Sequence, residues 1–156
     1  MTGNVPSSMP AIPHFPNDRE ELIRDLIDRG RTYLPGTLDM EVVEIGEGTA
    51  LLRCPIAEKH LALNGFLHAG SVIALADTAA GYGCVANRPE GAIGFTTLEI
   101  KSNHVSTLLE GAMVARATMI HGGRTTQVWD VVVNDEATDR PLAYYRATQL
   151  ILYPRD

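Results

Sequence analysis

Two stretches of the chain carry apolar residues at helical spacing. In the first, residues 17–30, Asn17 can cap the start and Gly30 is a natural stop. Its apolar stripe consists of Leu22, Ile23, Leu26 and Ile27. The second, residues 70–86, is apolar or small on every side, which is typical of a helix that is buried all round. The pattern therefore predicts an amphipathic helix and, later in the chain, a core helix.

The remaining apolar runs have the length and residue types of strands. Residues 38–43 and 49–55 flank a glycine-containing turn and predict a hairpin. Four longer runs span residues 93–105, 112–121, 125–134 and 142–153. A tight turn at Gly122-Gly123 and a polar turn at residues 135–140 join the last three, so we expect an antiparallel meander. Strands of this length twist and curl, and can wrap around a helix. The sequence thus predicts an α+β fold, a curved antiparallel sheet around one buried helix.

One helix cannot easily cover both faces of such a sheet. We expect the outer face to carry apolar side chains from the run that ends near residue 134. The candidates are Val128, Trp129, Val131, Val132 and Val133. An exposed apolar sheet face implies a partner, and the simplest partner is a second copy of the chain. A homodimer or homotetramer is therefore predicted.

Composition and charge exclude several classes of protein. A chain of 156 residues is most simply one domain, here residues 17–156, after a Pro- and Ser-rich segment, residues 1–16, that we interpret as a flexible arm. That arm lacks the pattern of a signal peptide, and no wholly apolar run reaches the ~18 residues of a membrane span. The net charge of −6 argues against nucleic-acid binding. Cys54 and Cys84 have no ligand-like spacing, so we expect free thiols, no metal or cofactor, and a cytoplasmic location.

The predicted core helix contains one carboxylate, although buried helices rarely carry a charge. Asp77 is the single charge within residues 70–86. Burying an unpaired carboxylate is costly, so its position indicates a purpose. His68 lies nine residues upstream, in a turn-rich entry to the same helix. A polar loop, a helix start and a buried acid along one segment predict a functional site.

The spacing of three segments resembles the hotdog-fold thioesterases of the phenylacetate-pathway type. The pattern begins with Gly65-Phe66-Leu67-His68-Ala69-Gly70, continues with an acid nine residues after the histidine, Asp77, and ends with Thr97-Leu98-Glu99-Ile100-Lys101-Ser102-Asn103 on the next strand. The turn at residues 122–124 also fits, and the likeness covers about residues 35–153. Two positions depart from the family pattern: Ala69 replaces a glycine, and Ala62 occupies a slot that is often asparagine, with Asn64 in a different register.

The resemblance implies hydrolysis of acyl-CoA thioesters at the interface of a dimer. Asp77 would activate water or attack the thioester directly. Gly70, near the helix start, would hold the oxyanion of the other subunit's site. His68 would orient substrate or loop, and Thr97 would hold the water. The substrate would contact Asn64, Gly65, Phe66 and Ala69. The lysines and arginines that bind the CoA phosphates are not assigned by the sequence.

Two other functions remain open on the sequence alone. A related hydratase acting on enoyl-CoA uses an Asp with a His five residues later, a position that is Tyr82 here. A non-catalytic acyl-CoA-binding protein would keep the fold and lose the acid, which is present.

The size of the acyl group can be estimated only from the residues next to Asp77. The small residues Ala74, Ala80 and Gly81 would leave room for an acyl group, and Tyr82 and Phe66 could stack on a ring. The same small residues could instead let the helix lie close to the sheet. We expect aryl or short-to-medium acyl groups in preference to palmitoyl.

Overall fold

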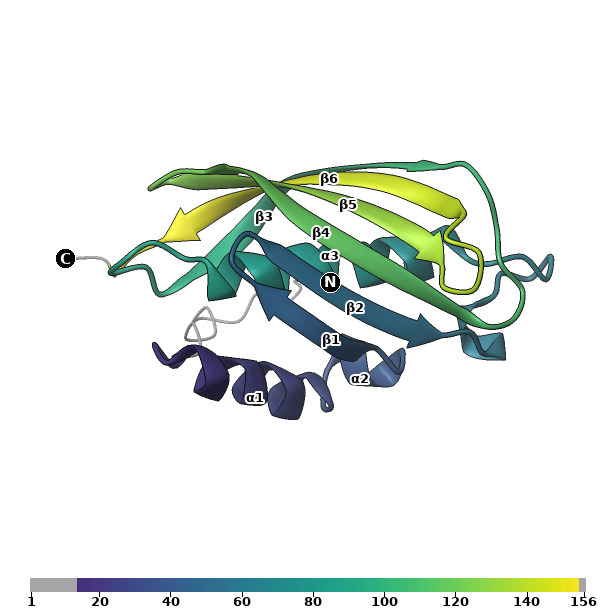
Figure 1. The fold of residues 1–156 in the computed structure, drawn as a ribbon, viewed down its shortest axis with the longest axis horizontal. Coiled ribbons are helices and arrows are strands. Elements are labelled where there is room, and N and C mark those ends of the chain that lie inside the picture. Colours follow the sequence, from purple (N-terminus) through teal and green to yellow (C-terminus); the bar gives the residue numbers. More distant parts are fainter. Residues whose placement is uncertain (1–13, 155–156) are drawn as a thin grey trace, which may run out of the picture.

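The computed structural model describes residues 14–154. A six-stranded antiparallel sheet curves around a central helix, α3 (Ala69–Ala86), as Figure 1 shows. The strands are β1 (Glu41–Gly46), β2 (Thr49–Pro55), β3 (Gly94–His104), β4 (Ala112–Gly122), β5 (Thr126–Asp135) and β6 (Pro141–Leu152). Their order in the sheet is β1-β2-β4-β5-β6-β3. The predicted α+β fold, a curved sheet wrapped around one helix, is confirmed.

Three helical elements precede α3. Helix α1 (Arg19–Gly30) ends at the predicted glycine, but its cap is Asp18, whose side chain accepts a hydrogen bond from the Glu21 N–H at 2.9 Å. A helical turn, α2 (Leu34–Thr37), with Pro35 near its start, was not predicted, and the first strand therefore begins at Glu41 instead of residue 38. A 3₁₀ turn, η1 (Glu58–His60), leads into the loop before α3.

The meander is confirmed for β4, β5 and β6, but β3 does not lie beside β4. Strand β3 pairs instead with β6, from Gly94 opposite Leu152 to His104 opposite Ala143. Strand β2 takes the place next to β4. Residues 105–111 therefore cross from one edge of the sheet to its interior, and β3 is left as an edge strand. This edge matters because β3 carries Thr97.

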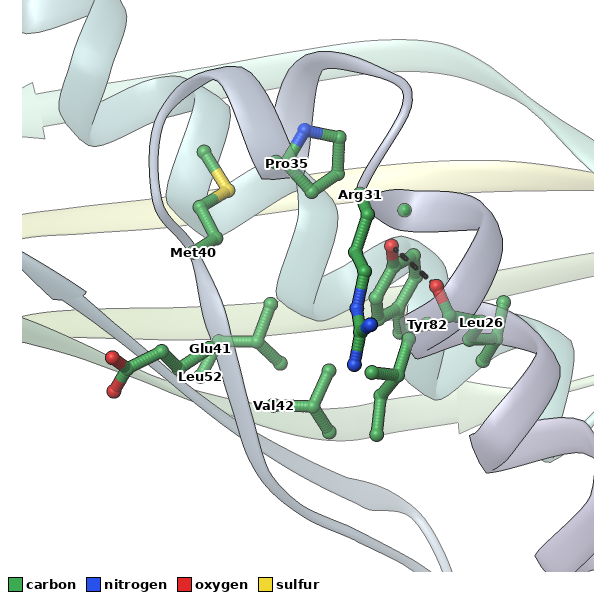
Figure 2. A pocket seen from close by; sticks show the side chains of 11 residues that line it. Leu26, Arg31, Pro35, Met40, Glu41, Val42, Leu52 and Tyr82 are labelled. Atoms are coloured by element: carbon green, nitrogen blue, oxygen red, sulfur yellow. Dashed lines mark hydrogen bonds between the residues drawn. The ribbon is translucent and has the colours of Figure 1, made fainter.

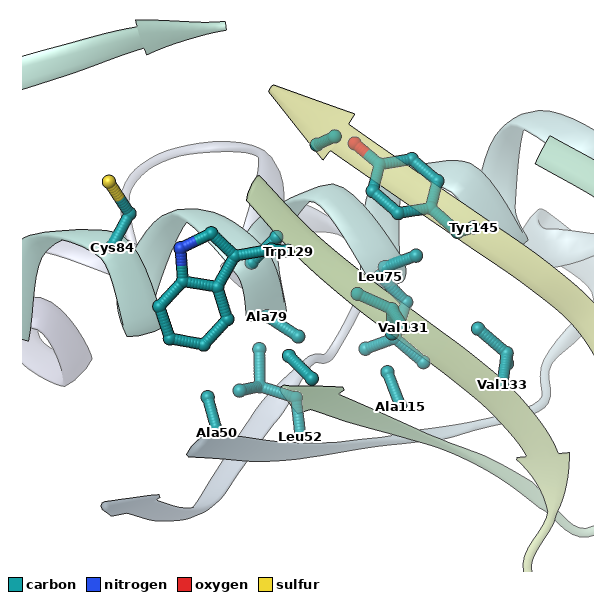
Figure 3. Packing of buried hydrophobic residues seen from close by; sticks show 14 of the residues in the cluster. Ala50, Leu52, Leu75, Ala79, Cys84, Ala115, Trp129, Val131, Val133 and Tyr145 are labelled. Carbon is teal, nitrogen blue, oxygen red and sulfur yellow. The ribbon is translucent and has the colours of Figure 1, made fainter. Parts of the chain in front are cut away.

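The core lies between α3 and the concave face of the sheet. Trp129 is fully buried, and its ring rests on Gly83, where an added Cβ would lie 2.6 Å from two ring carbons. Figure 3 shows this ring beside Cys84 and Ala79 of the helix. The indole N–H donates to the Gln127 side chain at 2.9 Å, which in turn donates to the Asn87 carbonyl at 2.8 Å. The sheet is thereby tied to the C-terminal end of α3.

The predicted apolar outer face is only partly correct. Trp129, Val131 and Val133 point toward the helix and are buried, whereas Val128 and Val132 occupy the other face and are half-buried. The reason is the two-residue period of a strand, which does not allow five nearly consecutive residues to share one face. The outer face of β5 is therefore mixed, with Asp130 between the two valines.

The predicted arm, residues 1–16, falls largely outside the described residues. Of its last residues, Phe15 and Pro16 are half-buried, and their carbonyls accept hydrogen bonds from the Arg88 guanidinium at 3.2 and 2.6 Å. By length and composition, one helix in the described part of the chain could cross a membrane, and it is α3. Because more than half of that helix is buried against the sheet, we interpret it as a core helix.

Candidate active site

Asp77 lies in the middle of α3, on the face of the helix that the sheet leaves open. Ile73, Ala74, Asp77 and Thr78 along this face are half-buried, whereas the opposite side of the helix is fully covered. The prediction of a helix buried all round is therefore wrong, because the sheet of one chain wraps only part of the circumference. Little in the sequence indicates this, since Asp77 is the single charged residue on the open face.

An open groove of about 520 Å³ runs in front of Asp77, between α3 and the edge strand β3. It is lined by Leu34, Gly70, Ile73, Ala74, Asp77, Thr97, Leu98, Glu99 and Ile100. Three predicted catalytic residues, Asp77, Gly70 and Thr97, thus line a single groove. The pairing of β3 with β6 shifts between Thr97 and Glu99, so the strand bulges at the point where it faces the acid.

The carboxylate of Asp77 has one hydrogen-bond partner among the described residues, the hydroxyl of Tyr145. This hydroxyl donates to Asp77 Oδ1 at 2.7 Å from strand β6. Burial, reinforced by the nearby carboxylate, raises the pKa of Tyr145 far above its ordinary value, so the phenol remains a donor. Thr78 donates to the Ala74 carbonyl at 2.7 Å and does not serve the acid.

Sequence reasoning missed Tyr145, which is 68 residues from Asp77 in the chain. A weak signal exists, because strand alternation must turn one residue of the Tyr144-Tyr145 pair toward the helix. Nothing in the sequence says that this residue reaches the acid.

The start of α3 presents a different set of donors from the one predicted. His68 is the N-cap, and its Nδ1 accepts a hydrogen bond from the Gly70 N–H at 2.8 Å. The proposed oxyanion donor is therefore already engaged in this structure. The N–H of Ala69, the first helical residue, has no acceptor among residues 14–154, and Ala69 is exposed. The free donor at this helix start is thus Ala69.

A buried histidine, His60, holds the same helix start through hydrogen bonds on its buried side. His60 is fully buried, and its Nδ1 accepts from the Ala57 N–H at 2.9 Å. Its Nε2 therefore carries the proton and donates to the Leu38 carbonyl at 3.0 Å. The His60 carbonyl accepts from the His68 N–H at 2.9 Å and from the Ser71 hydroxyl at 3.0 Å. One residue thus ties the loop, the cap and the first turn of α3 together.

The predicted substrate-binding loop does not reach the groove in front of Asp77. Asn64, Gly65 and Phe66 form an exposed turn that is closed by a bridge between Leu61 and Leu67. The Asn64 side chain accepts from the Phe66 N–H at 3.1 Å, so it shapes the turn. Neither these three residues nor His68 lines the groove of their own chain.

The acid, Asp77, and the free N–H at the helix start, Ala69, lie well apart along α3. Ala69 and Asp77 are eight residues apart in α3, which separates them by about 12 Å along the helix axis. The base, the water that it holds, the carbonyl that the water attacks and the donor to the carbonyl oxygen together span at most about 10 Å when fully extended. The acid and the free N–H are thus separate features of α3 in the described chain.

A second cavity, of about 290 Å³, lies between α1, α2, β1 and the later part of α3. Figure 2 shows Tyr82 in its wall, with the hydroxyl donating to the Leu26 carbonyl at 3.3 Å, beside Arg31, Pro35 and Met40. Tyr82 is thus turned away from the Asp77 groove. The expectation that Tyr82 flanks the acyl group is not met, because Tyr82 lines this other cavity. Phe66 does not line the Asp77 groove of its own chain, and its contact with substrate stays a prediction.

Small residues of α3 play two different roles. Ala74 lines the groove, as expected. Ala80 and Gly81 do not, because both are buried, and an added Cβ on Gly81 would lie 2.9 Å from the Phe95 ring. For these two positions, the alternative explanation holds: small residues let the helix lie close to the sheet.

Metal-binding clusters and reactive thiols offer no second site in the described part of the chain. Within residues 14–154, no group of three or more His, Cys, Asp or Glu side chains is placed to hold a metal ion. Burial raises the pKa of the Cys54 thiol to about 11 and that of Cys84 to about 12. Both thiols are therefore poor nucleophiles near neutral pH.

Comparison with known proteins agrees with this geometry. A sequence model described as "Thioesterase superfamily" matches residues 64–141, from the loop before α3 to the start of β6. The chain belongs to this superfamily. It is 35% identical over 115 residues to the 1,4-dihydroxy-2-naphthoyl-CoA hydrolase of Listeria monocytogenes, covering 74% of this chain and 92% of that protein. The protein is therefore a thioester hydrolase, as predicted.

Solved structures of the superfamily have the same fold. A thioesterase from Haemophilus influenzae superposes with a TM-score of 0.77 at 26% identity, over 83% of this chain and 90% of that one. The PaaI protein from the phenylacetic acid degradation operon of Escherichia coli superposes with a TM-score of 0.76 at 18% identity, over 86% and 93%. The second likeness concerns the fold alone. The predicted hotdog fold of a thioesterase is confirmed.

Proposed function

We propose that this thioester hydrolase cleaves acyl-CoA thioesters at a site shared by two copies of the chain. The observation that carries the proposal is the separation within α3: the acid and the free N–H at the helix start lie about 12 Å apart. A second copy can bring its own helix start to the acid of the first. Two equivalent sites then arise from one two-fold axis.

The edge strand β3 supports pairing with a second copy. Its outer edge has no strand beside it in the described chain, and Leu98 and Ile100 on it are 58% and 44% exposed. An edge strand of this length presents unpaired backbone N–H and C=O groups that a second copy can pair with. Pairing β3 with its copy would extend the sheet across the dimer. It would also close the groove in front of Asp77, which is lined by this strand.

The residues can be assigned roles in the hydrolysis. Asp77 takes a proton from water, with Thr97 on the opposite wall of the groove to hold that water. The water oxygen bonds to the carbonyl carbon, and the resulting oxyanion is held by the Ala69 N–H and the helix start of the second copy. The C–S bond then breaks as Asp77 returns its proton to the sulfur, so the CoA thiol and the carboxylic acid leave and the carboxylate is restored. Gly70 lines the groove, and His68 accepts the hydrogen bond of the Gly70 N–H and so holds the helix start in place.

An aromatic acyl group is the substrate that we favour. The relative from Listeria monocytogenes bears the name of a naphthoyl-CoA hydrolase. The groove is bounded by Ile73, Ala74, Leu98 and Ile100, which supply an apolar wall for a flat group. The hydratase alternative lacks support, because Tyr82, five residues after the acid, is engaged with Leu26 in another cavity.

The test is an assay of thiol release from a panel of CoA thioesters. The panel contains 1,4-dihydroxy-2-naphthoyl-, benzoyl-, phenylacetyl-, hexanoyl- and palmitoyl-CoA. Asp77→Asn should lower kcat by about 10²- to 10⁴-fold without changing the melting temperature, because it keeps the shape and removes the base. Glu99→Gln is the matched control, since it neutralises the other carboxylate of the groove and should leave kcat within about threefold.

Three outcomes would count against the proposal. Near-normal turnover of Asp77→Asn would remove the acid from the mechanism. A higher kcat/KM for palmitoyl-CoA than for every aryl thioester would contradict the substrate class. A mass of one chain, 16.9 kDa, by sedimentation at micromolar concentration would contradict the shared site.

A further inference from the structure

The environment of the Asp77 carboxylate contains one buried group to which the reaction above gives no role. Tyr145 is 3% exposed, and its hydroxyl donates to Asp77 Oδ1 at 2.7 Å. Its ring belongs to the core cluster under α3, so the hydroxyl has little freedom to move. Figure 3 shows this ring at the end of the cluster, on β6. A phenol fixed in this way can determine the orientation of a partly exposed carboxylate.

The hydrogen bond makes the two oxygens of the Asp77 carboxylate inequivalent. Oδ1 is held by the sheet, whereas Oδ2 has no partner among the described residues. Asp77 lines the groove, and Tyr145 reaches its carboxylate from strand β6. Oδ2 is therefore the oxygen available to a group bound in the groove. The other ionisable group of the groove wall is Glu99, for which no hydrogen bond to Asp77 is present. Tyr145 is therefore the group that sets which oxygen faces the substrate.

We propose that Tyr145 is a positioning residue for the Asp77 carboxylate, acting through the hydrogen bond to Oδ1 and not through contact with substrate. This inference rests on the proposed thioesterase site. Without the phenol, the carboxylate can rotate and spread over several orientations, of which few place an oxygen correctly toward the water. The loss is expected in kcat, because substrate binding does not use the phenol.

The donor should also influence the pH dependence of the reaction. A hydrogen bond to an anion favours its charged form, so the loss of the donor disfavours it. Burial and the adjacent carboxylate hold the pKa of Tyr145 far above its ordinary value, which keeps the donor in place throughout the assay range. The acidic limb of the kcat/KM profile should therefore move to higher pH when the hydroxyl is removed.

The experiment compares Tyr145→Phe with Tyr144→Phe. The neighbouring Tyr144 points to the outer face of the sheet and is 48% exposed, so its variant controls for the loss of a hydroxyl on the same strand. Tyr145→Phe should lower kcat about 10- to 100-fold with KM changed less than threefold, the range expected for a hydrogen bond to a charged group. Its acidic limb should move to higher pH, while Tyr144→Phe retains wild-type kinetics. In an Asp77→Asn background, Tyr145→Phe should change the residual kcat less than twofold, because the two residues act as one unit.

A crystal structure of Tyr145→Phe separates this inference from the proposed function. The Asp77 carboxylate should occupy more than one orientation in that variant. If the wild-type protein released no thiol from any thioester of the panel, the proposed function would fail, and the structure would still decide the positioning role. Wild-type kcat and pH profile in Tyr145→Phe, or a single unchanged carboxylate orientation, would overturn the inference.

Discussion

Deleting a single N–H at the start of α3 tests the oxyanion site without disturbing the fold. The substitution is Ala69→Pro. Proline is well tolerated at the first position of a helix, since that N–H has no partner within the helix. The preceding residue must be extended, and His68 has φ −71° and ψ 130°. The cap is preserved, because His68 accepts from Gly70, whose N–H remains.

The two consequences of this change have different expected magnitudes. Removing one donor from an oxyanion site costs about 10²- to 10³-fold in kcat, or roughly 2.7–4 kcal/mol. Proline at a compatible position stabilises a protein by up to ~1 kcal/mol, because it restricts the unfolded chain. Ala69→Pro should therefore lower kcat at least ~100-fold while the melting temperature stays the same or rises slightly. Both quantities are measured on the same preparation, by thiol release and by calorimetry.

Ala69→Val is the matched control, because it adds similar bulk and keeps the N–H. Its kcat should stay within about threefold of wild type. If Ala69→Val lost as much activity as Ala69→Pro, bulk in the groove would explain the effect. If Ala69→Pro kept wild-type kcat, the oxyanion would be held elsewhere.

Mixing two inactive variants extends the test to the shared site. When Ala69→Pro and Asp77→Asn chains exchange in equal amounts, about half of the dimers are mixed, and each has one intact site of two. Activity should recover to about a quarter of the wild-type value. No recovery above the sum of the parent activities, with exchange verified by differently tagged chains, would place the whole site within one chain.

Two further predictions concern the core. Gly83→Ala should destabilise the protein by about 1–2 kcal/mol in urea unfolding, because the added Cβ would lie 2.6 Å from a fully buried tryptophan ring. This overpacking exceeds the ~1 kcal/mol that alanine gains over glycine in helix propensity. The control, Gly81→Ala, meets the far end of a half-buried phenylalanine ring and should be close to neutral, so equal stability of the two variants would refute the argument. The second prediction is that the free energy of unfolding falls as pH rises from about 9, the ordinary pKa of a thiol, toward 11. In this range the thiols of the unfolded chain ionise, whereas burial keeps those of Cys54 and Cys84 protonated, with pKa values of about 11 and about 12. Urea midpoints measured between pH 8 and 10.5 should decline less in a variant with both cysteines replaced by alanine, and an equal decline would contradict this.

The sequence specified the elements far better than their arrangement. The run predicted at 142–153 is observed at Pro141–Leu152, because strand periodicity and turn residues are local properties. The edge position of β3 is decided by pairing with β6, about fifty residues later in the chain, and no local pattern encodes that choice. The short helix α2 was missed for a related reason, since its four residues are too few to show a period.

The candidate site was predictable where one segment carries it and not where the fold assembles it. The spacing from His68 to Asp77 is a property of one helix and its cap, and the helix is present as predicted. The role of Tyr145 depends on a contact between α3 and β6. The engaged N–H of Gly70 depends on the rotamer of a capping histidine, which the residue type alone does not determine.

The strand order also has a consequence for how the protein is made. Strand β3 is synthesised before β4, β5 and β6, yet its partner in the sheet is the last strand to leave the ribosome. Both β-strand residues near Asp77, Thr97 on β3 and Tyr145 on β6, therefore reach their places only when the C-terminal strand docks. Contacts that join distant parts of a chain form slowly, so the groove should mature at the end of folding. A chain that stalls before β6 would retain α3 and the central strands but would lack the Tyr145 support for its acid. Its unpaired β3, with Leu98 and Ile100 exposed, would be available to chaperones.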